Sequence, residues 1–145
     1  MYKSFYSLAK TPFSKEISVT DAFPSTEFQG ALAGLEYLRK TKGIGLLVGD
    51  PGAGKTFALR AFKESLSPSL YHVVYFPMST GGVMDFYRAL AYGLGEEPKF
   101  RKVDVFRQIQ TGIERMAVER KITPVIMLDE MHMAKDAFLQ DIALL

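Results

Sequence analysis

The sequence predicts an α/β fold in which helices flank a parallel sheet, and two observations support this prediction. Three short apolar runs have the length and residue content of buried strands: "IGLLVGD" at 44–50, "YHVVYFPM" at 71–78 and "TPVIMLDE" at 123–130. Longer segments with apolar residues at helical spacing separate these runs. Strands that alternate with helices form parallel sheets with right-handed crossovers.

Length and composition restrict the class of protein. The 145 residues, of which 48% are apolar, suffice for a single domain. With 18 Lys and Arg against 16 Asp and Glu, nucleic-acid binding would need a local basic patch. The absence of Cys excludes disulfides and Cys-ligated zinc. Because the sequence shows no signal peptide and no run of about 20 apolar residues, we expect a cytoplasmic protein that does not bind membranes.

The N-terminal part is predicted to form an arm and one helix. Residues 1–24 show no clear period and are predicted to be a packed N-terminal arm. From Thr26, apolar residues follow the i, i+3, i+4 rule, and Thr26 with Gln29 fits a capping box. Gly43, preceded by basic residues, is typical of the end of a helix. The predicted apolar face comprises Phe28, Ala31, Leu32, Leu35 and Leu38.

Four more helices are predicted between and after the strands. They lie in "FALRAFKESL" at 57–66, "GGVMDFYRALAYGLG" at 81–95 and "DVFRQIQTGIERMAVERK" at 104–121, and a last one begins in "KDAFLQDIALL" at 135–145. Asp104 is the predicted N-cap of its helix. The predicted apolar faces comprise Val83, Tyr87, Leu90 and Leu94 on one helix, and Phe106, Ile109, Ile113 and Met116 on the next.

The segment "GDPGAGKT" at 49–56 matches the phosphate-loop pattern G-x-x-x-x-G-K-[ST] and lies between a predicted strand and helix. Gly52 and Gly54 let the backbone amides turn toward a phosphate, and the helix N-terminus adds partial positive charge. Lys55 is predicted to reach the β- and γ-phosphates of ATP, and Thr56 to place its hydroxyl on Mg²⁺. A glycine-rich turn without a ligand is the alternative. The predicted nucleotide-binding residues are Gly49, Asp50, Pro51, Gly52, Ala53, Gly54, Lys55, Thr56 and Phe57, with Asp50 as a variable turn position.

Asp129 and Glu130 follow directly on the apolar run "VIML". In P-loop proteins an acid at the end of a second strand holds the Mg²⁺ shell, so Asp129 is predicted as a metal ligand beside Thr56. Glu130 is the predicted catalytic residue, with Lys55, because it can orient or deprotonate an attacking water. A small-molecule kinase, which transfers the phosphoryl group to a substrate hydroxyl, would not need a residue that activates water. Two solvated carboxylates at a strand end are the alternative, but the phosphate loop upstream favours ATP hydrolysis.

Other polar residues have weaker signals. His132 is interpreted as a polar loop residue with a catalytic role as the alternative, and His72 as structural. The segment "STGG" at 79–82 is a strand-to-helix turn or a ligand loop.

Basic residues gather around Phe100. Lys99, Arg101 and Lys102, with Arg107 further on, could follow a phosphate backbone and would bind DNA without reading its sequence. A solvated helix entrance is the alternative.

The chain resembles the AAA+ ATPases that are encoded beside DDE transposases in bacterial insertion elements, often labelled secretion-pathway A-type ATPases. The resemblance rests on "YKSFYSLAKTPFSKEI", "FQGALAGLEYLRKTKGIGLLVGDPGAGKT", "STGGVMDFYRALAYGLG", "FRKVDVFRQIQ" and "PVIMLDEMH". It implies ATP and Mg²⁺ as cofactors, assembly on DNA, and a DDE transposase as partner. It also implies that the arm lies near the adenine, and it strengthens the DNA prediction for Lys99, Arg101 and Lys102.

The resemblance also implies parts that cannot be placed in this sequence. AAA+ modules continue past the Asp-Glu strand to a sensor strand, an arginine finger and a helical lid. We therefore expect residues 25–145 to be the N-terminal part of an AAA+ nucleotide-binding domain, an incomplete P-loop NTPase sheet without its C-terminal strands and lid. In the implied strand order, 5-1-4-3-2, a gap separates the phosphate-loop strand from the Asp-Glu strand. We expect the chain either to close this gap with non-native packing or to pair its free strands with those of another copy. AAA+ interfaces are a second possible route to self-association.

Three functions remain open. The first is an ATPase, part of a longer parent that assists a transposase, with weak or no turnover in this chain. The second is a secretion or envelope-assembly ATPase without a DNA partner. The third is a non-hydrolysing interaction module.

Overall fold

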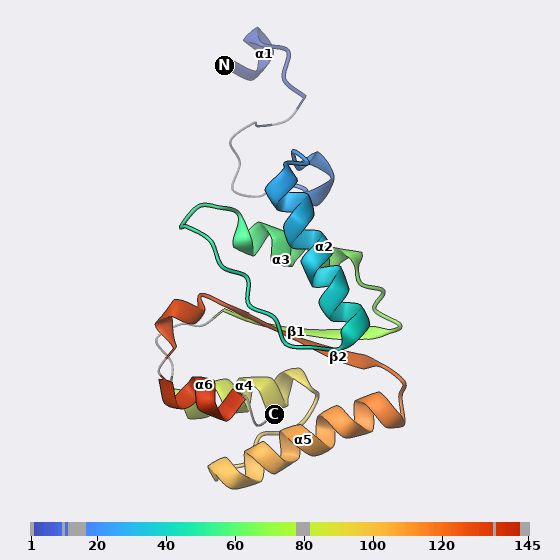
Figure 1. Cartoon of the computed structure of the whole chain (residues 1–145), viewed down its shortest axis with the longest axis vertical. Helices are drawn as coiled ribbons and strands as arrows, with labels where there is room; N and C mark the ends of the chain where they lie inside the picture. The colour runs from blue at the N-terminus through green and yellow to red at the C-terminus, as the bar shows by residue number, and fades with distance from the viewer. Residues whose placement is uncertain (1, 10, 12–16, 78–81, 135, 143–145) are drawn as a thin grey trace. The chain divides into compact units, whose positions relative to one another are not determined.

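The computed structural model describes residues 2–9, 11, 17–77, 82–134 and 136–142 (Figure 1). Parts of the predicted arm (1, 10 and 12–16), most of the "STGG" loop (79–81) and residues 135 and 143–145 of the last predicted helix lie outside the described residues. The chain divides into two compact units, Met1–Phe62 and Lys63–Leu145. Each unit is described by itself.

The first unit contains α1 (Tyr2–Phe5), the short 3₁₀ helix η1 (Val19–Asp21), α2 (Thr26–Thr41) and most of α3 (Lys55–Ser65). None of the helices in the described residues of either unit is long and apolar enough to cross a membrane.

Helix α2 confirms the predicted helix, but its cap is different. Ser25 has an extended backbone just outside the helix, and its hydroxyl oxygen accepts a hydrogen bond from the Phe28 amide at 3.2 Å. The predicted capping box of Thr26 and Gln29 is therefore wrong, because the hydroxyl one residue earlier already satisfies an amide of the first turn. The predicted apolar face of α2 is half-buried along its whole length.

The sequence predicts a buried strand at 44–50, and this prediction is wrong. A strand requires a neighbour for its ladder of hydrogen bonds, and within the described residues no strand pairs with this segment. The segment instead passes close to α2, where a Cβ at Gly45 would clash with Cδ1 of Leu38. Ile44, Leu46 and Val48 are exposed.

Helix α3 contacts both α2 and the arm within the first unit. The rings of Phe28 and Phe57 lie 5.5 Å apart between centroids. The Arg60 guanidinium lies 4.9 Å from the Phe57 ring centroid and donates a hydrogen bond to the Ile17 carbonyl. The helix that follows the phosphate loop is thereby fixed to both preceding segments.

The second unit is built on two parallel strands, as predicted. β1 (Tyr71–Pro77) pairs with β2 (Thr123–Asp129) in a register that runs from Tyr71 opposite Thr123 to Pro77 opposite Asp129. Nε2 of His72 lies 2.6 Å from the Gly93 carbonyl oxygen, which supports the structural interpretation of this histidine.

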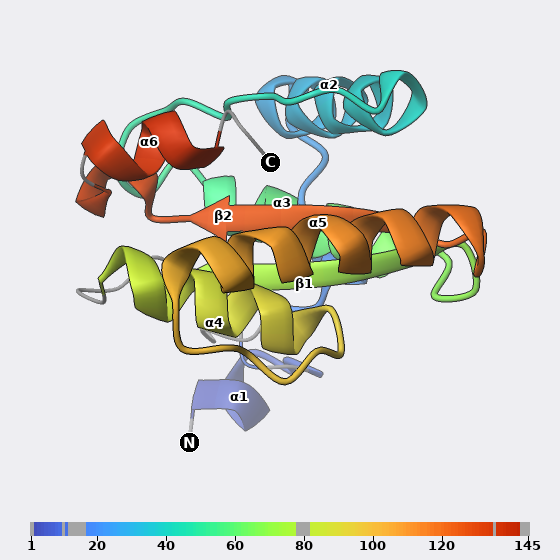
Figure 2. The same cartoon turned by 90° about the horizontal axis from the view of Figure 1, so that it is seen from below.

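Helices α4 (Val83–Gly93) and α5 (Lys102–Val118) pack against one face of the sheet, where the core of the second unit lies (Figure 2). The short 3₁₀ helix η2 (Met131–Met133) and α6 (Asp136–Ile142) follow β2, and the rings of Phe138 and Phe86 lie 4.6 Å apart. Both predicted helix faces are confirmed. The buried core cluster comprises Val74, Phe86, Tyr87, Leu90, Ala91, Leu94, Val105, Ile109, Met116 and Phe138.

Helix α5 begins two residues earlier than predicted. Its N-cap is Arg101, and Asp104 lies inside the first turn, with Oδ2 3.9 Å from Nε of Arg101. The prediction of Asp104 as N-cap is therefore wrong. Aspartate is favoured in the first turn of a helix, where it interacts with the helix dipole, as well as at the N-cap. The presence of an aspartate near the start of α5 therefore does not identify the N-cap.

Candidate nucleotide site

The phosphate loop of the first unit has the backbone that its glycines predict. Gly52 and Gly54 have φ of 81° and 86°, in the left-handed region that other residues avoid. The Ala53 amide donates to the Asp50 carbonyl at 3.1 Å, and the Ala58 amide donates to the Gly54 carbonyl at 2.9 Å. The loop thus turns tightly and passes directly into α3, so that a helix N-terminus follows it.

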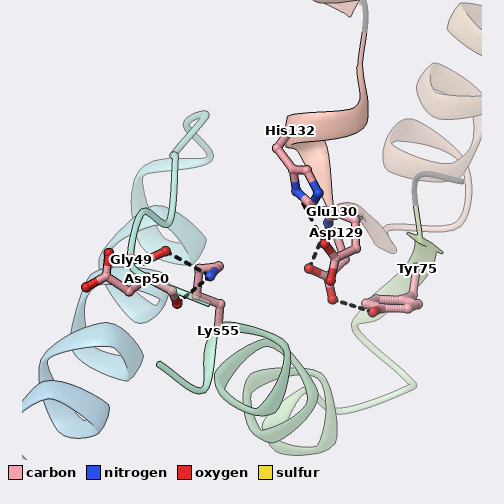
Figure 3. A network of polar contacts seen from close by, with 7 residues as sticks. All are labelled: Gly49, Asp50, Lys55, Tyr75, Asp129, Glu130 and His132. Atoms are coloured by element: carbon pink, nitrogen blue, oxygen red, sulfur yellow. Dashed lines mark hydrogen bonds and ion pairs between the residues drawn. The ribbon is translucent and has the colours of Figure 1, made fainter. Parts of the chain in front are cut away.

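Lys55 folds back onto the loop that precedes it (Figure 3). Its Nζ donates hydrogen bonds to the Gly49 carbonyl at 2.9 Å and to the Asp50 carbonyl at 3.0 Å. Both acceptors are neutral, and an ammonium bonds more strongly to an ionised oxygen than to a neutral one. Phosphate oxygens can therefore replace these two carbonyls as partners of Lys55.

The next two residues have different environments. Thr56 is exposed, as a residue that meets a ligand must be. Phe57 is half-buried between Phe28 and Arg60, so its side chain has a packing role in α3. Its predicted contact with nucleotide remains a prediction, as do those of Pro51 and the other loop residues.

In the second unit, Asp129 is largely enclosed at the carboxyl end of β2. The residue is only 7% exposed. Oδ2 accepts a hydrogen bond from the Tyr75 hydroxyl at 2.7 Å, and Oδ1 accepts one from the Glu130 amide at 2.9 Å (Figure 3). These donors compensate for the burial of a charge, which would otherwise be costly.

Tyr75 was missed by reasoning from the sequence. Burial raises the pKa of Tyr75 to about 12, and the hydrogen bond to Asp129 and the charges of Asp129 and Glu130 act in the same direction. In the observed register Tyr75 lies opposite Met127, two residues before Asp129, so both side chains lie on the same face of the sheet. The signal was present in the alternation of the strands, but it requires the register, which the sequence does not give.

Glu130 has a strained backbone and an exposed side chain. Its φ of 57° and ψ of 36° lie in the left-handed region, which costs a residue with a side chain about 1 kcal/mol. Oε2 lies 3.3 Å from Nδ1 of His132, and both side chains are mostly exposed. Strained residues concentrate at functional sites. The carboxylate is in contact with solvent beside His132, and contact with solvent is what the predicted activation of water requires.

Comparison with known proteins places these features in a family. A family model described as AAA domain matches residues 38–145. The chain belongs to the AAA domain family. Domains of this family are nucleotide-binding P-loop ATPases, so the phosphate loop and the Asp-Glu strand have their expected context. Comparisons with curated proteins and with solved structures gave no match.

The two predicted metal ligands belong to different units. Thr56 of the first unit and Asp129 of the second each carry an oxygen donor, the type that Mg²⁺ prefers, and their binding of Mg²⁺ stays a prediction. Within the residues that the structure describes, no group of three or more His, Cys, Asp or Glu side chains could hold a metal.

The basic residues near Phe100 do not share one environment. Nζ of Lys102 lies 5.8 Å from the Tyr87 ring centroid, a cation–π contact with a core residue. Arg101 is largely exposed beside Asp104. Phe100 between them is 90% exposed. Of the three predicted DNA contacts, Lys102 therefore lies against Tyr87, whereas Lys99 and Arg101 flank an exposed ring.

The segment around Phe100 is held in place by one glutamine. The Gln108 side chain donates to the Glu97 carbonyl at 2.7 Å and accepts from the Lys99 amide at 3.3 Å. Arg115 also forms an ion pair with Glu96. The exposed ring and its basic neighbours are thus carried on an ordered turn.

Proposed function

We propose that this AAA domain binds ATP with Mg²⁺ and hydrolyses it with Glu130 as the residue that activates water. The observation that carries the proposal is the phosphate loop: two glycines in the left-handed region, a helix that starts at Lys55, and an ammonium held by carbonyls of the loop. Lys55 would neutralise the β- and γ-phosphates, and Thr56 and Asp129 would hold Mg²⁺.

Glu130 separates hydrolysis from simple binding. Its strained backbone and exposed carboxylate next to the enclosed Asp129 support two different roles for adjacent acids.

Titration with ATP, with and without Mg²⁺, beside a phosphate-release assay tests this function. Lys55→Ala should weaken ATP binding by about 10- to 100-fold, because hydrogen bonds to charged groups are lost. Lys40→Ala, an exposed lysine of α2, is the matched control and should bind like the wild type. Glu130→Gln should retain ATP binding and lose any turnover. Equal ATP binding by the Lys55 and Lys40 variants would contradict the proposal.

We further propose that the protein assembles on DNA and assists a DDE transposase. The resemblance of the sequence supports this proposal, as do the exposed residues Lys99 and Arg101 on either side of the exposed Phe100. An exposed ring between cations suits a nucleic acid, whose phosphates meet the charges while its bases offer a stacking surface.

Binding of a labelled DNA duplex at several salt concentrations tests the DNA proposal. Replacing Lys99 and Arg101 together by Ala should weaken DNA binding. It should also reduce the steepness with which the logarithm of the binding constant falls with the logarithm of the salt concentration, by about one per lost phosphate contact. Arg120→Ala, an exposed arginine after α5, should leave both unchanged. Salt-independent or absent DNA binding by the wild-type chain would instead favour the secretion ATPase.

A further inference from the structure

We propose that the Tyr75 hydroxyl positions the Asp129 carboxylate for Mg²⁺, so that Tyr75 is a positioning residue of the nucleotide site. This inference rests on the proposed function, because it takes Asp129 as the residue that meets the metal. It adds a residue of β1 that the phosphate-loop and Asp-Glu patterns do not contain.

The geometry fixes the carboxylate from two sides. The Tyr75 hydroxyl donates to Oδ2 at 2.7 Å, and the Glu130 amide donates to Oδ1 at 2.9 Å. One donor belongs to β1 and the other to the residue that follows β2. A carboxylate held by a single donor can rotate about that bond, whereas two donors from different segments define its plane.

Hydrogen bonding and metal binding are compatible at a carboxylate. Each oxygen of an ionised carboxylate has about two lone-pair sites, so an oxygen that accepts a hydrogen bond, as Oδ1 and Oδ2 of Asp129 do, can also meet Mg²⁺ or a water of its shell. Donors that orient a metal-binding carboxylate are a general feature of metal sites, and their loss typically costs 10- to 100-fold in metal affinity.

Tyr75 is itself held in place, which a positioning residue requires. It lies within the ladder between β1 and β2, opposite Met127. On the same unit, Nζ of Lys63 lies 6.0 Å from its ring centroid. The ring is half-buried, so both the strand backbone and the ring of Tyr75 are restricted in their motion.

Metal-dependent ATP binding by Tyr75→Phe tests the inference, because the change removes only the hydroxyl. We expect the Mg²⁺ concentration for half-maximal metal-dependent ATP binding to rise about tenfold. ATP binding in EDTA should stay at the wild-type level, since Lys55 and the loop amides do not involve Tyr75. Tyr92→Phe, which removes a hydroxyl from an exposed residue of α4, is the matched control and should change neither value.

Paramagnetic resonance of Mn²⁺ added with ADP provides a second readout that is independent of ATP binding curves and turnover. Tyr75→Phe should weaken the bound Mn²⁺ signal at a fixed metal concentration, and the thermal melting temperature shows whether the variant is folded. An unchanged metal requirement in a folded variant overturns the inference. Equal losses of binding with and without metal overturn it too, because the hydroxyl would then serve only stability. If the wild type binds no ATP under either condition, the proposed function itself fails.

Discussion

Asp129 obtains its environment from residues that are distant in the sequence. The acid itself could be predicted, because an apolar run before Asp-Glu, downstream of a phosphate loop, has few other interpretations. Tyr75 could not be predicted, because its contact with Asp129 depends on the register of β1 against β2. Glu130 shows a similar division: its identity is in the sequence, whereas its left-handed backbone is seen only in the structure.

The raised pKa of Tyr75 predicts how stability depends on pH. The protonated hydroxyl is favoured in the folded state, where its pKa is about 12 compared with 10.0 for an unperturbed tyrosine. The stabilisation is therefore complete below pH 10 and is lost as the pH rises toward 12. Urea denaturation of the wild type and of Tyr75→Phe at pH 8 to 12 measures the contribution of this hydroxyl to the free energy of unfolding. The free-energy difference between the two proteins should shrink at high pH, and a constant difference would disagree with the prediction.

Among the helices and strands, the type of an element was easier to predict from the sequence than the residues at which it begins and ends. The faces of α4 and α5 and the existence of β1 and β2 follow from periodicity and residue type, which survive errors of a residue or two. Caps depend on single side chains, and both capping predictions were one to three residues from the observed positions. The strand predicted at 44–50 failed for a different reason, because pairing depends on a neighbour and cannot be read from the segment alone.

The observed cap of α2 can be checked by comparing two adjacent hydroxyls. Ser25→Ala removes the acceptor of the Phe28 amide and should lower the free energy of unfolding by about 1 kcal/mol. Thr26→Ala removes the hydroxyl predicted from the sequence and should cost less than about 0.5 kcal/mol, since surface changes away from a cap are small. Urea denaturation followed by circular dichroism distinguishes them. The reverse order would restore Thr26 as the cap.

For the molecule as a whole, the sequence predicted the class of fold and the family better than the internal division. The α/β architecture follows from the strand-helix alternation, and the AAA assignment, which the resemblance of the sequence implied, is confirmed by the match of the family model to residues 38–145. The two units, Met1–Phe62 and Lys63–Leu145, were not foreseen. The boundary between the two units falls between Phe62 and Lys63, inside α3. Neither the amino-acid composition nor the order of the predicted helices and strands indicates a boundary at that position.

Exposure along residues 43–50 predicts self-association. Ile44, Leu46 and Val48 are 85%, 80% and 79% exposed and alternate as in a strand. Backbone groups of such a segment favour strand pairing with a second copy. Sedimentation velocity should show a mass that rises with protein concentration, and replacing Ile44 and Val48 by Lys should suppress the rise. Tyr92→Lys, at an equally exposed site, is the control. A wild-type monomer at all concentrations would contradict the prediction.

The left-handed backbone of Glu130 has a consequence for protein engineering. Glycine adopts this conformation without penalty, so Glu130→Gly should relieve strain of about 1 kcal/mol. A library screened only for heat resistance would therefore enrich glycine at this position and discard the acid proposed to activate water. Stability and catalysis make opposite demands on residue 130, and any thermostabilised version of this domain should keep its glutamate fixed during selection.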